Sequence, residues 1–500
     1  MPDVLLVKLE PDVGRYQVAP PFGILYLASA LRQAGFSVRL IHERGSTAAI
    51  SNVVERVVRE RPLMVGLSTL TGPSLAPTLQ VSRQIRNACD IPIVWGGFHP
   101  TMLPEQTLAS GCVDVAVIGE GEETVVDLAA SLAQGGLREQ ALGGIPGIAF
   151  RAGGQTVLTG RRRLLPDLDR YRPEWELLDI RSYFFGDRHF YSDLGSKLTA
   201  PVVASVITSR GCPWRCGYCY NQFVNARSFR AHSAERVIAD IEALKARYGV
   251  SALIFEDDCF FADRERGLAI VRRLGIPWGT SIRASEIVRW GSAFVGELAG
   301  LQCQEVRIGA ESGSQRMLDL VEKDITVEQI EKAVELCASH GIRTTLSFMI
   351  GFPDETREDI DATFALMDRL EAKGAAVAVN GPGIYLPWPG TALYELAVRR
   401  GFRPPATTDG WARALWGARQ PRTPFLPTGY QLSGYYRFLA FRKEMGFLRL
   451  PFFARVLAGI ARLRWQRRFF RFPLDYHLPR LLLRALHRVG LRKLGEAVYN

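Results

Sequence analysis

The sequence lacks any hydrophobic run that could form a membrane-spanning helix. Its longest uncharged stretch, Gly374 to Tyr394, has 21 residues, but Pro382, Pro387, Pro389 and several glycines interrupt it, and a spanning helix needs about 20 continuous apolar residues. A secretory signal is also missing, because acidic residues flank the short apolar run at the N-terminus where such a signal has a basic start and a longer apolar segment. We therefore expect a cytoplasmic protein without a transmembrane segment.

Cysteine is scarce, with eight residues in 500, far below the density of a disulfide-stabilised scaffold. Five cysteines occur singly, and we expect them to be buried free thiols in a reducing compartment. These five are Cys89, Cys112, Cys259, Cys303 and Cys337. The other three, Cys212, Cys216 and Cys219, fall within eight residues of one another and need a different explanation.

The first 440 residues have no excess charge of either sign. Of 62 Lys and Arg residues, 14 follow residue 440, and of 51 Asp and Glu residues only three do, which leaves 48 of each sign in the first 440. The net charge of +11 therefore belongs to the last 60 residues. A basic surface that binds nucleic acid all over the molecule is disfavoured, and we expect no nucleic-acid partner; one localised basic region remains to be explained.

Short apolar runs alternate with helical patterns over the first 135 residues, which predicts a doubly wound, flavodoxin-like parallel sheet. Strands are expected at 4–7, 38–41, 64–68, 93–95 and 113–118, and helices at 24–34, 49–60, 74–87 and 122–132. Ligands of such sheets bind beyond the carboxyl ends of the strands, so the loops after Val7, Ser68, Trp95 and Ile118 are the expected binding region.

The remaining chain is predicted to contain a linker, a second α/β domain and a helical end. Residues 136–200 lose the alternation and indicate a small antiparallel piece followed by an irregular linker. Residues 201–389 form a second βα series, a partial (β/α)6 barrel of the TIM type. Its strands are expected at 202–208, 252–256, 278–282, 305–310, 343–350 and 376–379. Residues 390–500 show no strand pattern and are predicted to be helical and basic.

The cysteine triplet, Cys212-Pro-Trp-Arg-Cys216-Gly-Tyr-Cys219, directly follows the first strand of the second series. It therefore lies on a loop at the end of a parallel sheet where active sites are found. Three cysteine ligands to a cubane iron–sulfur cluster leave one iron open to substrate. The alternative is a zinc site, which usually completes four protein ligands with a second pair at regular spacing. No such pair is near, since the closest histidines are His189 and His232.

With Tyr218 just before its last cysteine, this motif resembles the radical S-adenosylmethionine superfamily. The resemblance implies a 4Fe-4S cluster on the three cysteines, with S-adenosylmethionine chelating the fourth iron and yielding a 5′-deoxyadenosyl radical. Further superfamily landmarks follow at successive strand ends, and the resemblance implies that they bind S-adenosylmethionine. They are Glu256 in Glu256-Asp257-Asp258, Ser281 and Arg283, Glu311 in Gly309-Ala310-Glu311-Ser312, and Ile350 to Pro353. The alternative for the three acids at 256–258 is a solvated loop.

The N-terminal domain lacks the Gly-x-Gly-x-x-Gly fingerprint of dinucleotide-binding proteins after its first strand. Glycine motifs do follow later strands. They are Gly96-Gly97-Phe98-His99 and Gly119-Glu120-Gly121-Glu122, and they occur together with Pro20-Pro21-Phe22-Gly23. The set resembles the cobalamin-binding domains that precede radical S-adenosylmethionine cores. The resemblance implies a cobalamin between the strand ends of the two domains, in contact with Gly96, Gly97, His99, Gly119 and Gly121.

The sequence departs from the cobalamin pattern at the histidine that ligates cobalt. The Asp-x-His-x-x-Gly loop is absent after the first strand, and His42 follows the second strand with Leu40 where the aspartate belongs. We therefore expect a base-off corrinoid that His42 does not ligate. His99 precedes a proline, and its alternative role is to brace the loop by a hydrogen bond. The alternative for Glu120 and Glu122 is that they begin the next helix, whose N-terminus favours acids.

Four arginines recur at four-residue intervals near the C-terminus, namely Arg480, Arg484, Arg488 and Arg492. Such a stripe beside leucines fits three structures. One is a helix packed on the barrel with its arginines in water, the second is an amphipathic helix at an anionic membrane surface, and the third is a nucleic-acid contact. The second predicts peripheral membrane contact, a location at the inner face of the membrane and a lipid-like substrate.

The resemblance implies a cobalamin-dependent radical S-adenosylmethionine methyltransferase. Methylcobalamin would supply a methyl group to an unactivated carbon of a small-molecule or lipid-like metabolite, and flavodoxin or ferredoxin would donate electrons. One alternative keeps both cofactors but performs a cyclisation, ring contraction or oxidation. Others are a cobalamin-free radical enzyme and a non-catalytic metal-binding protein.

Overall fold

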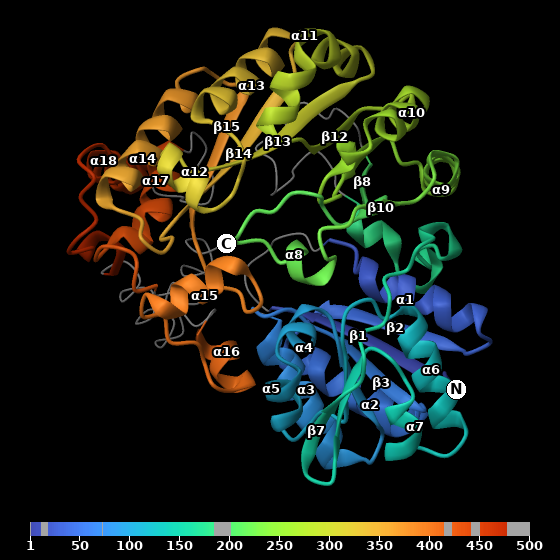
Figure 1. Ribbon diagram of the computed structural model, residues 1–500. Coiled ribbons are helices and arrows are strands. Elements are labelled where there is room, and N and C mark those ends of the chain that lie inside the picture. Colours follow the sequence, from blue (N-terminus) through green and yellow to red (C-terminus); the bar gives the residue numbers. More distant parts are fainter. Residues whose placement is uncertain are drawn as a thin grey trace.

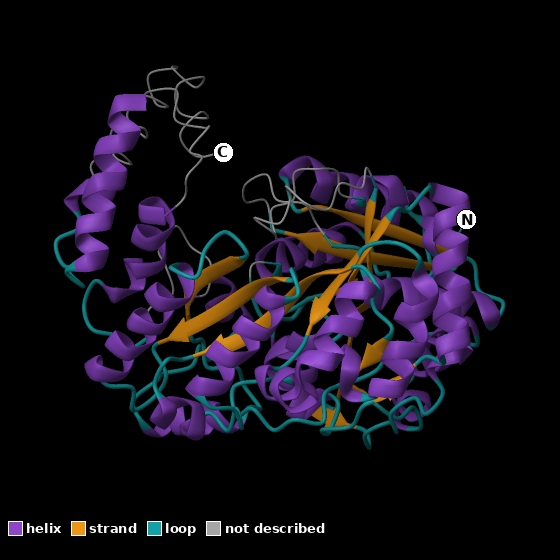
Figure 2. Ribbon diagram, turned by 90° about the horizontal axis from the view of Figure 1, so that it is seen from above, coloured by secondary structure: helices purple, strands orange, loops and turns teal. Residues whose placement is uncertain are grey.

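The computed structural model describes residues 2–11, 19–72, 74–184, 202–414, 423–441 and 451–477. A largely parallel sheet and a fully parallel sheet, each flanked by helices, make up most of the molecule, with further helices at the C-terminal end (Figures 1 and 2). The predicted arginine stripe at Arg480 to Arg492 lies outside the described residues.

The first sheet has seven strands in the order β2-β1-β3-β4-β5-β6-β7. The strands are β1 (Val4–Glu10), β2 (Val38–Arg44), β3 (Met64–Ser68), β4 (Ile93–Gly96), β5 (Val115–Val117), β6 (Ile148–Ala152) and β7 (Gln155–Leu158). The first five are parallel, and their order is that of a flavodoxin-like sheet. This part of the predicted fold class is confirmed.

Helices cover both faces of this sheet because alternate strand residues point to opposite sides. Leu6 of β1 packs with α1 (Phe22–Gln33) and α6 (Glu122–Ala133). Leu5 packs on the other face with α2 (Thr47–Glu60) and α3 (Leu75–Ala88). Three short helices complete the domain, namely α4 (Phe98–Met102), α5 (Pro104–Ala109) and α7 (Glu139–Gly143).

The antiparallel piece expected within residues 136–200 is the hairpin of β6 and β7. β6 pairs antiparallel with β5, so the hairpin extends the first sheet at its edge. Short 3-10 helices follow at Leu168–Arg170, Trp175–Leu177 and Ile180–Tyr183. The domain limits at residues 135 and 389 stay predictions.

The second sheet has six parallel strands in the order β15-β14-β13-β12-β11-β8. They are β8 (Val203–Val206), β11 (Ala252–Phe255), β12 (Trp278–Ser281), β13 (Cys303–Glu311), β14 (Arg343–Ile350) and β15 (Val377–Ile384). Each predicted strand of the second series is present, and the sheet is an open, partial barrel. β9 (Ser209–Arg210) and β10 (Arg230–Ala231) form a separate two-stranded ribbon.

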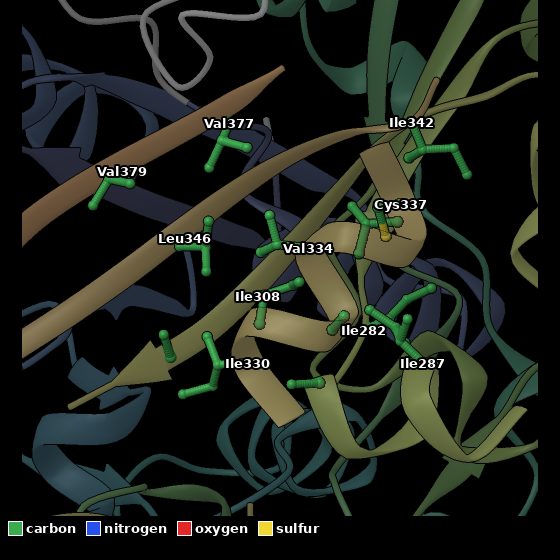
Figure 3. Packing of buried hydrophobic residues seen from close by; sticks show 14 of the residues in the cluster. Ile282, Ile287, Ile308, Ile330, Val334, Cys337, Ile342, Leu346, Val377 and Val379 are labelled. Atoms are coloured by element: carbon green, nitrogen blue, oxygen red, sulfur yellow. The ribbon is translucent and has the colours of Figure 1, made fainter. Parts of the chain in front are cut away.

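The helices of the second domain cover the outer face of its sheet and bury its largest apolar core. They are α9 (Ala234–Tyr248), α10 (Arg264–Leu274), α11 (Ala284–Gly300), α12 (Gln315–Leu320), α13 (Val327–Ser339) and α14 (Arg357–Glu371), with a 3-10 turn at Phe260–Ala262. The short helix α8 (Asn221–Val224) follows the cysteine loop and is not part of this core. Figure 3 shows Ile330, Val334 and Cys337 of α13 against Leu346 of β14. Cys337 is 1% exposed, which confirms its assignment to the core.

The chain continues with α15 (Ala392–Arg399), α16 (Thr408–Ala414), a 3-10 turn at Tyr430–Leu432, α17 (Ser433–Phe441) and α18 (Pro451–Gln466). α16 returns to the first domain, where Asp409 pairs with Arg83 of α3 at 2.6 Å. α17 and α18 pack at the far edge of the barrel beside α14 (Figure 1). None of the described helices has the length and apolar character needed to cross a membrane.

Candidate functional site

A cavity of about 460 Å³ lies where the carboxyl ends of the first sheet's strands face the second domain. Its first wall comes from the loops after β3, β4 and β5 and from the start of α1. Its second wall comes from residues on both sides of the cysteine loop and from the end of β11. The second-wall residues include Ile207, Ser209, Arg210, Gly211, Tyr220, Val224, Asn225, Glu256 and Asp258. The cavity is therefore shared by the two domains, as the sequence predicts.

The cavity has an apolar part and a polar part. Leu6, Val94 and Val117 line it from the face of the sheet that α1 and α6 cover, together with Leu27 and Val125 of those helices. Ser68, Glu120, Arg210, Glu256 and Asp258 contribute polar groups to the rest of the lining. A pocket of several hundred Å³ that combines an apolar interior with a few polar groups is typical of cofactor sites.

The predicted glycines line this cavity at the strand ends. Gly96, Gly97, Gly119 and Gly121 are all among its walls. Gly97 has a φ of +102°, and a Cβ there would lie 2.4 Å from the carbonyl oxygen of Thr69. Position 97 therefore accepts only glycine, because a side chain would strain the backbone and strike a neighbouring strand end.

His99 does not line the cavity. It is fully buried in α4, and its Nδ1 shares a hydrogen bond of 3.0 Å with the Thr71 hydroxyl. Burial lowers the pKa of His99 to about 4, so the ring is neutral at physiological pH. Of the two roles that the sequence leaves open, the structure shows the bracing of the loop.

His42 also lies away from the cavity. Its Nδ1 shares a hydrogen bond of 2.8 Å with the Tyr183 hydroxyl, and its Nε2 lies 3.2 Å from Oε1 of Glu10. Burial lowers the pKa of His42 more than the Glu10 hydrogen bond raises it. Both ring nitrogens are engaged within the protein, and no histidine is among the described residues that line the cavity.

Replacing His42 with alanine is therefore expected to leave the absorption spectrum of bound cobalamin in its base-off form. Both ring nitrogens have partners within the protein and His42 does not line the cavity, so its loss should not change the ligands of a bound cobalt. The spectrum of anaerobically reconstituted wild-type and His42→Ala protein checks this. A change from a base-on to a base-off spectrum caused by this substitution would show that His42 ligates cobalt.

The cysteine loop begins at Gly211 and is held from several sides. Gly211 has a φ of +85°, and a Cβ there would lie 2.0 Å from the carbonyl oxygen of Ser228. The Gly217 amide donates to the Val321 carbonyl at 2.8 Å, and the Gly217 carbonyl accepts from the Leu393 amide at 2.9 Å. These contacts anchor the loop to the end of α12 and the start of α15.

The three cysteines are free thiols, with Cys216 buried and Cys212 and Cys219 partly exposed. A hydrogen bond from Cys259 lowers the pKa of Cys212 to about 7, whereas burial raises the pKa of Cys219 to about 11. Among the described residues, no three His, Cys, Asp or Glu side chains are grouped so that they could hold one metal ion together. A cubane does not require such an arrangement, because each of its three cysteines binds a different iron.

Arg283 and Cys259 lie next to the three cysteines of the cysteine loop. Nη1 of Arg283 donates to Sγ of Cys216 at 3.6 Å, and the guanidinium lies 4.1 Å from the centre of the Trp214 ring. Arg283 is thus a predicted site residue that the structure brings to the cysteine loop. Cys259 is a buried free thiol, as expected, and it also contacts Cys212, which no local sequence signal reveals.

Tyr218 and Glu311, two further predicted residues, meet in a buried group. The Tyr218 hydroxyl donates to Oε1 of Glu311 at 2.8 Å. Lys323 completes the group, with its Nζ 2.9 Å from the same carboxylate oxygen and 3.1 Å from the tyrosine hydroxyl. Lys323 escaped the sequence analysis because it belongs to no motif.

The acids after β11 have separate positions. Glu256 lines the cavity and pairs with Arg307 of β13 at 2.8 Å, and Asp258 lines it beside Tyr220. Asp257 is buried and accepts hydrogen bonds from Thr208 and Ser209, which braces the strand end before the cysteine loop. Burial raises the pKa of Asp257 to about 6. Ser281 ends β12 in register with Arg307.

An ion-pair network joins the glycine loop after β5 to the strand that leads into the cysteine loop. Arg210 contacts Glu120 at 2.9 Å and Glu122 at 2.5 Å, and Arg230 contacts Glu120 at 2.9 Å. Glu122 does begin α6, as one alternative holds, but both acids also clamp the two domains together. Burial would raise the pKa of Glu120, yet Arg230 and Arg210 outweigh it and hold the pKa below the ordinary 4.5.

Replacing Arg210 with alanine is expected to lower the free energy of unfolding by about 3–5 kcal/mol at pH 7, because it leaves the buried Glu122 carboxylate without its partner and Glu120 with Arg230 alone. The contribution of Glu120 to the free energy of unfolding is present above pH 4.5. It is lost as the pH falls through the pKa of Glu120 in the folded protein, which is lowered. The difference between variant and wild type should therefore shrink in acid. Denaturant unfolding of both proteins at pH 7 and at pH 4 measures the difference in free energy of unfolding at each pH.

The matched control is Arg83→Ala, which removes the exposed pair with Asp409. Its expected cost is about 0–1 kcal/mol, since exposed ion pairs contribute little. Equal costs for the two variants would contradict the assignment of Arg210 to a buried clamp.

Comparison with known proteins identifies the class of this site. Residues 14–129 match the family described as B12 binding domain, and residues 206–367 match the Radical SAM superfamily. The two matched segments carry the two walls of the cavity. The chain belongs to the cobalamin-binding radical S-adenosylmethionine enzymes.

Proteins with similar sequences are named for more than one activity. The chain is 31% identical to an uncharacterized methyltransferase of Pyrococcus horikoshii over 387 residues, covering 76% of this chain and 78% of that protein. It is 29% identical to the anaerobic magnesium-protoporphyrin IX monomethyl ester cyclase of Rubrivivax gelatinosus, covering 78% and 69% respectively.

A solved structure confirms the fold. The radical S-adenosylmethionine methyltransferase TsrM from Kitasatospora setae, with cobalamin and a [4Fe-4S] cluster bound, superposes with a TM-score of 0.63 at 18% identity. The match covers 94% of this chain and 98% of that one. The two-domain arrangement with its helical C-terminal region is therefore shared.

Proposed function

We propose that this protein is a cobalamin-dependent radical S-adenosylmethionine methyltransferase that methylates an unactivated carbon of a small-molecule substrate. The observation that carries the proposal is the shared cavity, whose one wall holds the glycine loops and whose other wall flanks the cysteine loop. A corrinoid in the first domain would thus lie beside the source of the radical. If the activity used only one of the two domains, the cavity shared by both domains would have no role.

Residues of the cavity wall and of the adjoining cysteine loop fit the two cofactors. Gly96, Gly97, Gly119 and Gly121 allow close approach of a large flat ligand to the strand ends. Cys212, Cys216 and Cys219 would hold a 4Fe-4S cluster, which supplies the electron that cleaves S-adenosylmethionine. Arg283 beside Cys216 and the Tyr218–Glu311–Lys323 group would position the zwitterionic amino acid end of S-adenosylmethionine by charge and hydrogen bonds.

Glu256 and Ser281 complete the proposed set at neighbouring strand ends, where hydroxyl groups of the ribose could be bound. Glu256 is held by Arg307, so its carboxylate has a fixed direction at the cavity wall. Electrons would come from a flavodoxin- or ferredoxin-like donor. We also propose a cytoplasmic location, and peripheral membrane contact through the C-terminal region is a separate proposal.

A second candidate function is radical cyclisation without methyl transfer, and the similarity to the cyclase of Rubrivivax gelatinosus favours it. The two functions differ in their co-products. Methyl transfer yields S-adenosylhomocysteine together with 5′-deoxyadenosine, whereas cyclisation yields 5′-deoxyadenosine alone. Chromatography of both nucleosides after turnover by the cobalamin-loaded enzyme with its substrate separates the two functions. Turnover that makes no S-adenosylhomocysteine would contradict methyl transfer.

A further inference from the structure

Exposed apolar side chains gather at the C-terminal end of the described chain. Seven of the twelve large apolar side chains that are exposed in the described residues lie between positions 438 and 474. They are Phe438, Val456, Ile460, Leu463, Phe469, Phe472 and Leu474, and we call this set, defined by its position in the chain and its exposure, the C-terminal apolar surface. Such a concentration marks an interaction site more often than a random surface does.

The arrangement of α18 explains why these side chains face outward. Ala461 and Trp465 are each 1% exposed, and Nε1 of Trp465 donates to Asp368 of α14 at 2.7 Å. The opposite stripe of the helix, Val456, Ile460 and Leu463, is left uncovered at spacings of four and three residues. The helix is thus fixed to the barrel by one face and presents an apolar second face at the edge of the molecule (Figure 1).

The most exposed apolar side chains follow this helix. Phe472 is 77% exposed and Leu474 is 64% exposed. The segment that carries them is tied down, because Arg464 donates to the Phe472 carbonyl at 3.0 Å and to Asp475 at 2.7 Å. The two side chains are therefore presented on a fixed backbone, as an insertion point into an apolar phase requires.

Cations accompany the apolar side chains. Arg462, Arg467 and Arg471 are exposed, and no ion pair joins them to a carboxylate within the described residues. The nearby acids Asp475 and Asp368 are already paired with Arg464 and Arg468. This end of the molecule is consequently positive, whereas the first 440 residues have no net charge.

We propose that the C-terminal apolar surface docks the protein on an anionic phospholipid bilayer. Phe469, Phe472 and Leu474 would enter the headgroup region, and Arg467 and Arg471 would meet lipid phosphates. Exposed aromatic and aliphatic groups beside unpaired arginines are the combination that interfacial membrane binding uses. The surface lies on described residues and does not depend on the methyl-transfer proposal.

Co-sedimentation of the full-length protein with vesicles tests the docking surface. The vesicles contain phosphatidylglycerol and phosphatidylcholine in equal parts, or phosphatidylcholine alone. We expect binding to the mixed vesicles, weaker binding to the neutral ones, and loss of binding at high salt, because charges are screened beyond about 8 Å at physiological ionic strength. Equal binding to both vesicle types would overturn the role of the arginines.

The double variant Phe472→Ser, Leu474→Ser is expected to weaken binding at least about ten-fold, since two exposed apolar anchors are lost. Both positions are exposed, so the thermal unfolding midpoint should not change. The matched control is Leu158→Ser on β7, which is 50% exposed and distant in sequence, and it should bind like the wild type.

Two results would overturn the proposal. One is undiminished binding by the double variant together with loss of binding on charge reversal at Arg480, Arg484, Arg488 and Arg492, which would place the contact in the last residues alone. The other is a dimer of the vesicle-free protein that the double variant dissociates, which would show that a second copy covers this surface.

Discussion

With Cys212, Cys216 and Cys219 all replaced by alanine, the reconstituted protein is expected to lose its iron–sulfur absorption and to form no 5′-deoxyadenosine. The three thiols are the only predicted ligands of the cluster, and alanine offers no replacement donor. The fold should persist, because the loop is also anchored by backbone hydrogen bonds of Gly217 to Val321 and Leu393. Iron content and nucleoside formation measure the loss.

Two other cysteines provide the control for this experiment. Cys337 packs in the core of the second domain and Cys89 lies at the end of α3, both away from the cysteine loop in sequence. Alanine at either position should leave the iron content unchanged. Iron loss in these variants, or retained 5′-deoxyadenosine formation in the triple variant, would mean that the cluster ligands are assigned wrongly.

Leucine at position 96 is expected to weaken cobalamin binding by about 30-fold or more, which corresponds to about 2 kcal/mol. Gly96 lies on the same side of β4 as Val94, and both line the cavity. A Cβ at this position would have Val117 Cβ as its nearest neighbour at 3.9 Å, so the backbone accepts a side chain. The remaining atoms of leucine would then occupy the space proposed for the corrinoid.

Gly96→Ala is the matched control, because its single added carbon fits beside Val117 without filling the cavity. We expect its affinity for cobalamin to stay within about three-fold of the wild type. Absorbance titration with cobalamin measures the affinities, and iron content shows that both variants still assemble the cluster. Wild-type affinity of the leucine variant would place the corrinoid outside this cavity.

Much of the fold follows from the sequence because buried parallel strands leave a strong local signal. The runs at Met64–Ser68 and Arg343–Ile350 are predicted with the bounds that the structure has. The short helices α4 and α5 are missed, since five or six residues give too little periodicity to recognise. The packing of α16 on α3 is missed as well, because it joins positions more than 300 residues apart.

The residues of the candidate site also separate into those that the sequence predicts and those that it misses. The cysteine motif and the glycine loops are local, so the sequence identifies them. The structure places the glycine loops in one wall of the cavity and residues on both sides of the cysteine loop in the other. Lys323, Cys259 and the clamp of Arg210 with Glu120 depend on tertiary contacts between separate elements. His99 carries no local signal that separates ligand binding from bracing, and only its buried contact with Thr71 does so.

Feeding the native host with methionine that carries a trideuterated methyl group tests methyl transfer most directly. Metabolites of the parent strain and of a strain with Cys216→Ala are compared by mass spectrometry. The account predicts that one compound disappears in the variant strain, that a precursor smaller by one methylene accumulates, and that the lost compound carries three deuterium atoms. A lost compound that differs from its precursor by anything other than a labelled methyl group would contradict the account.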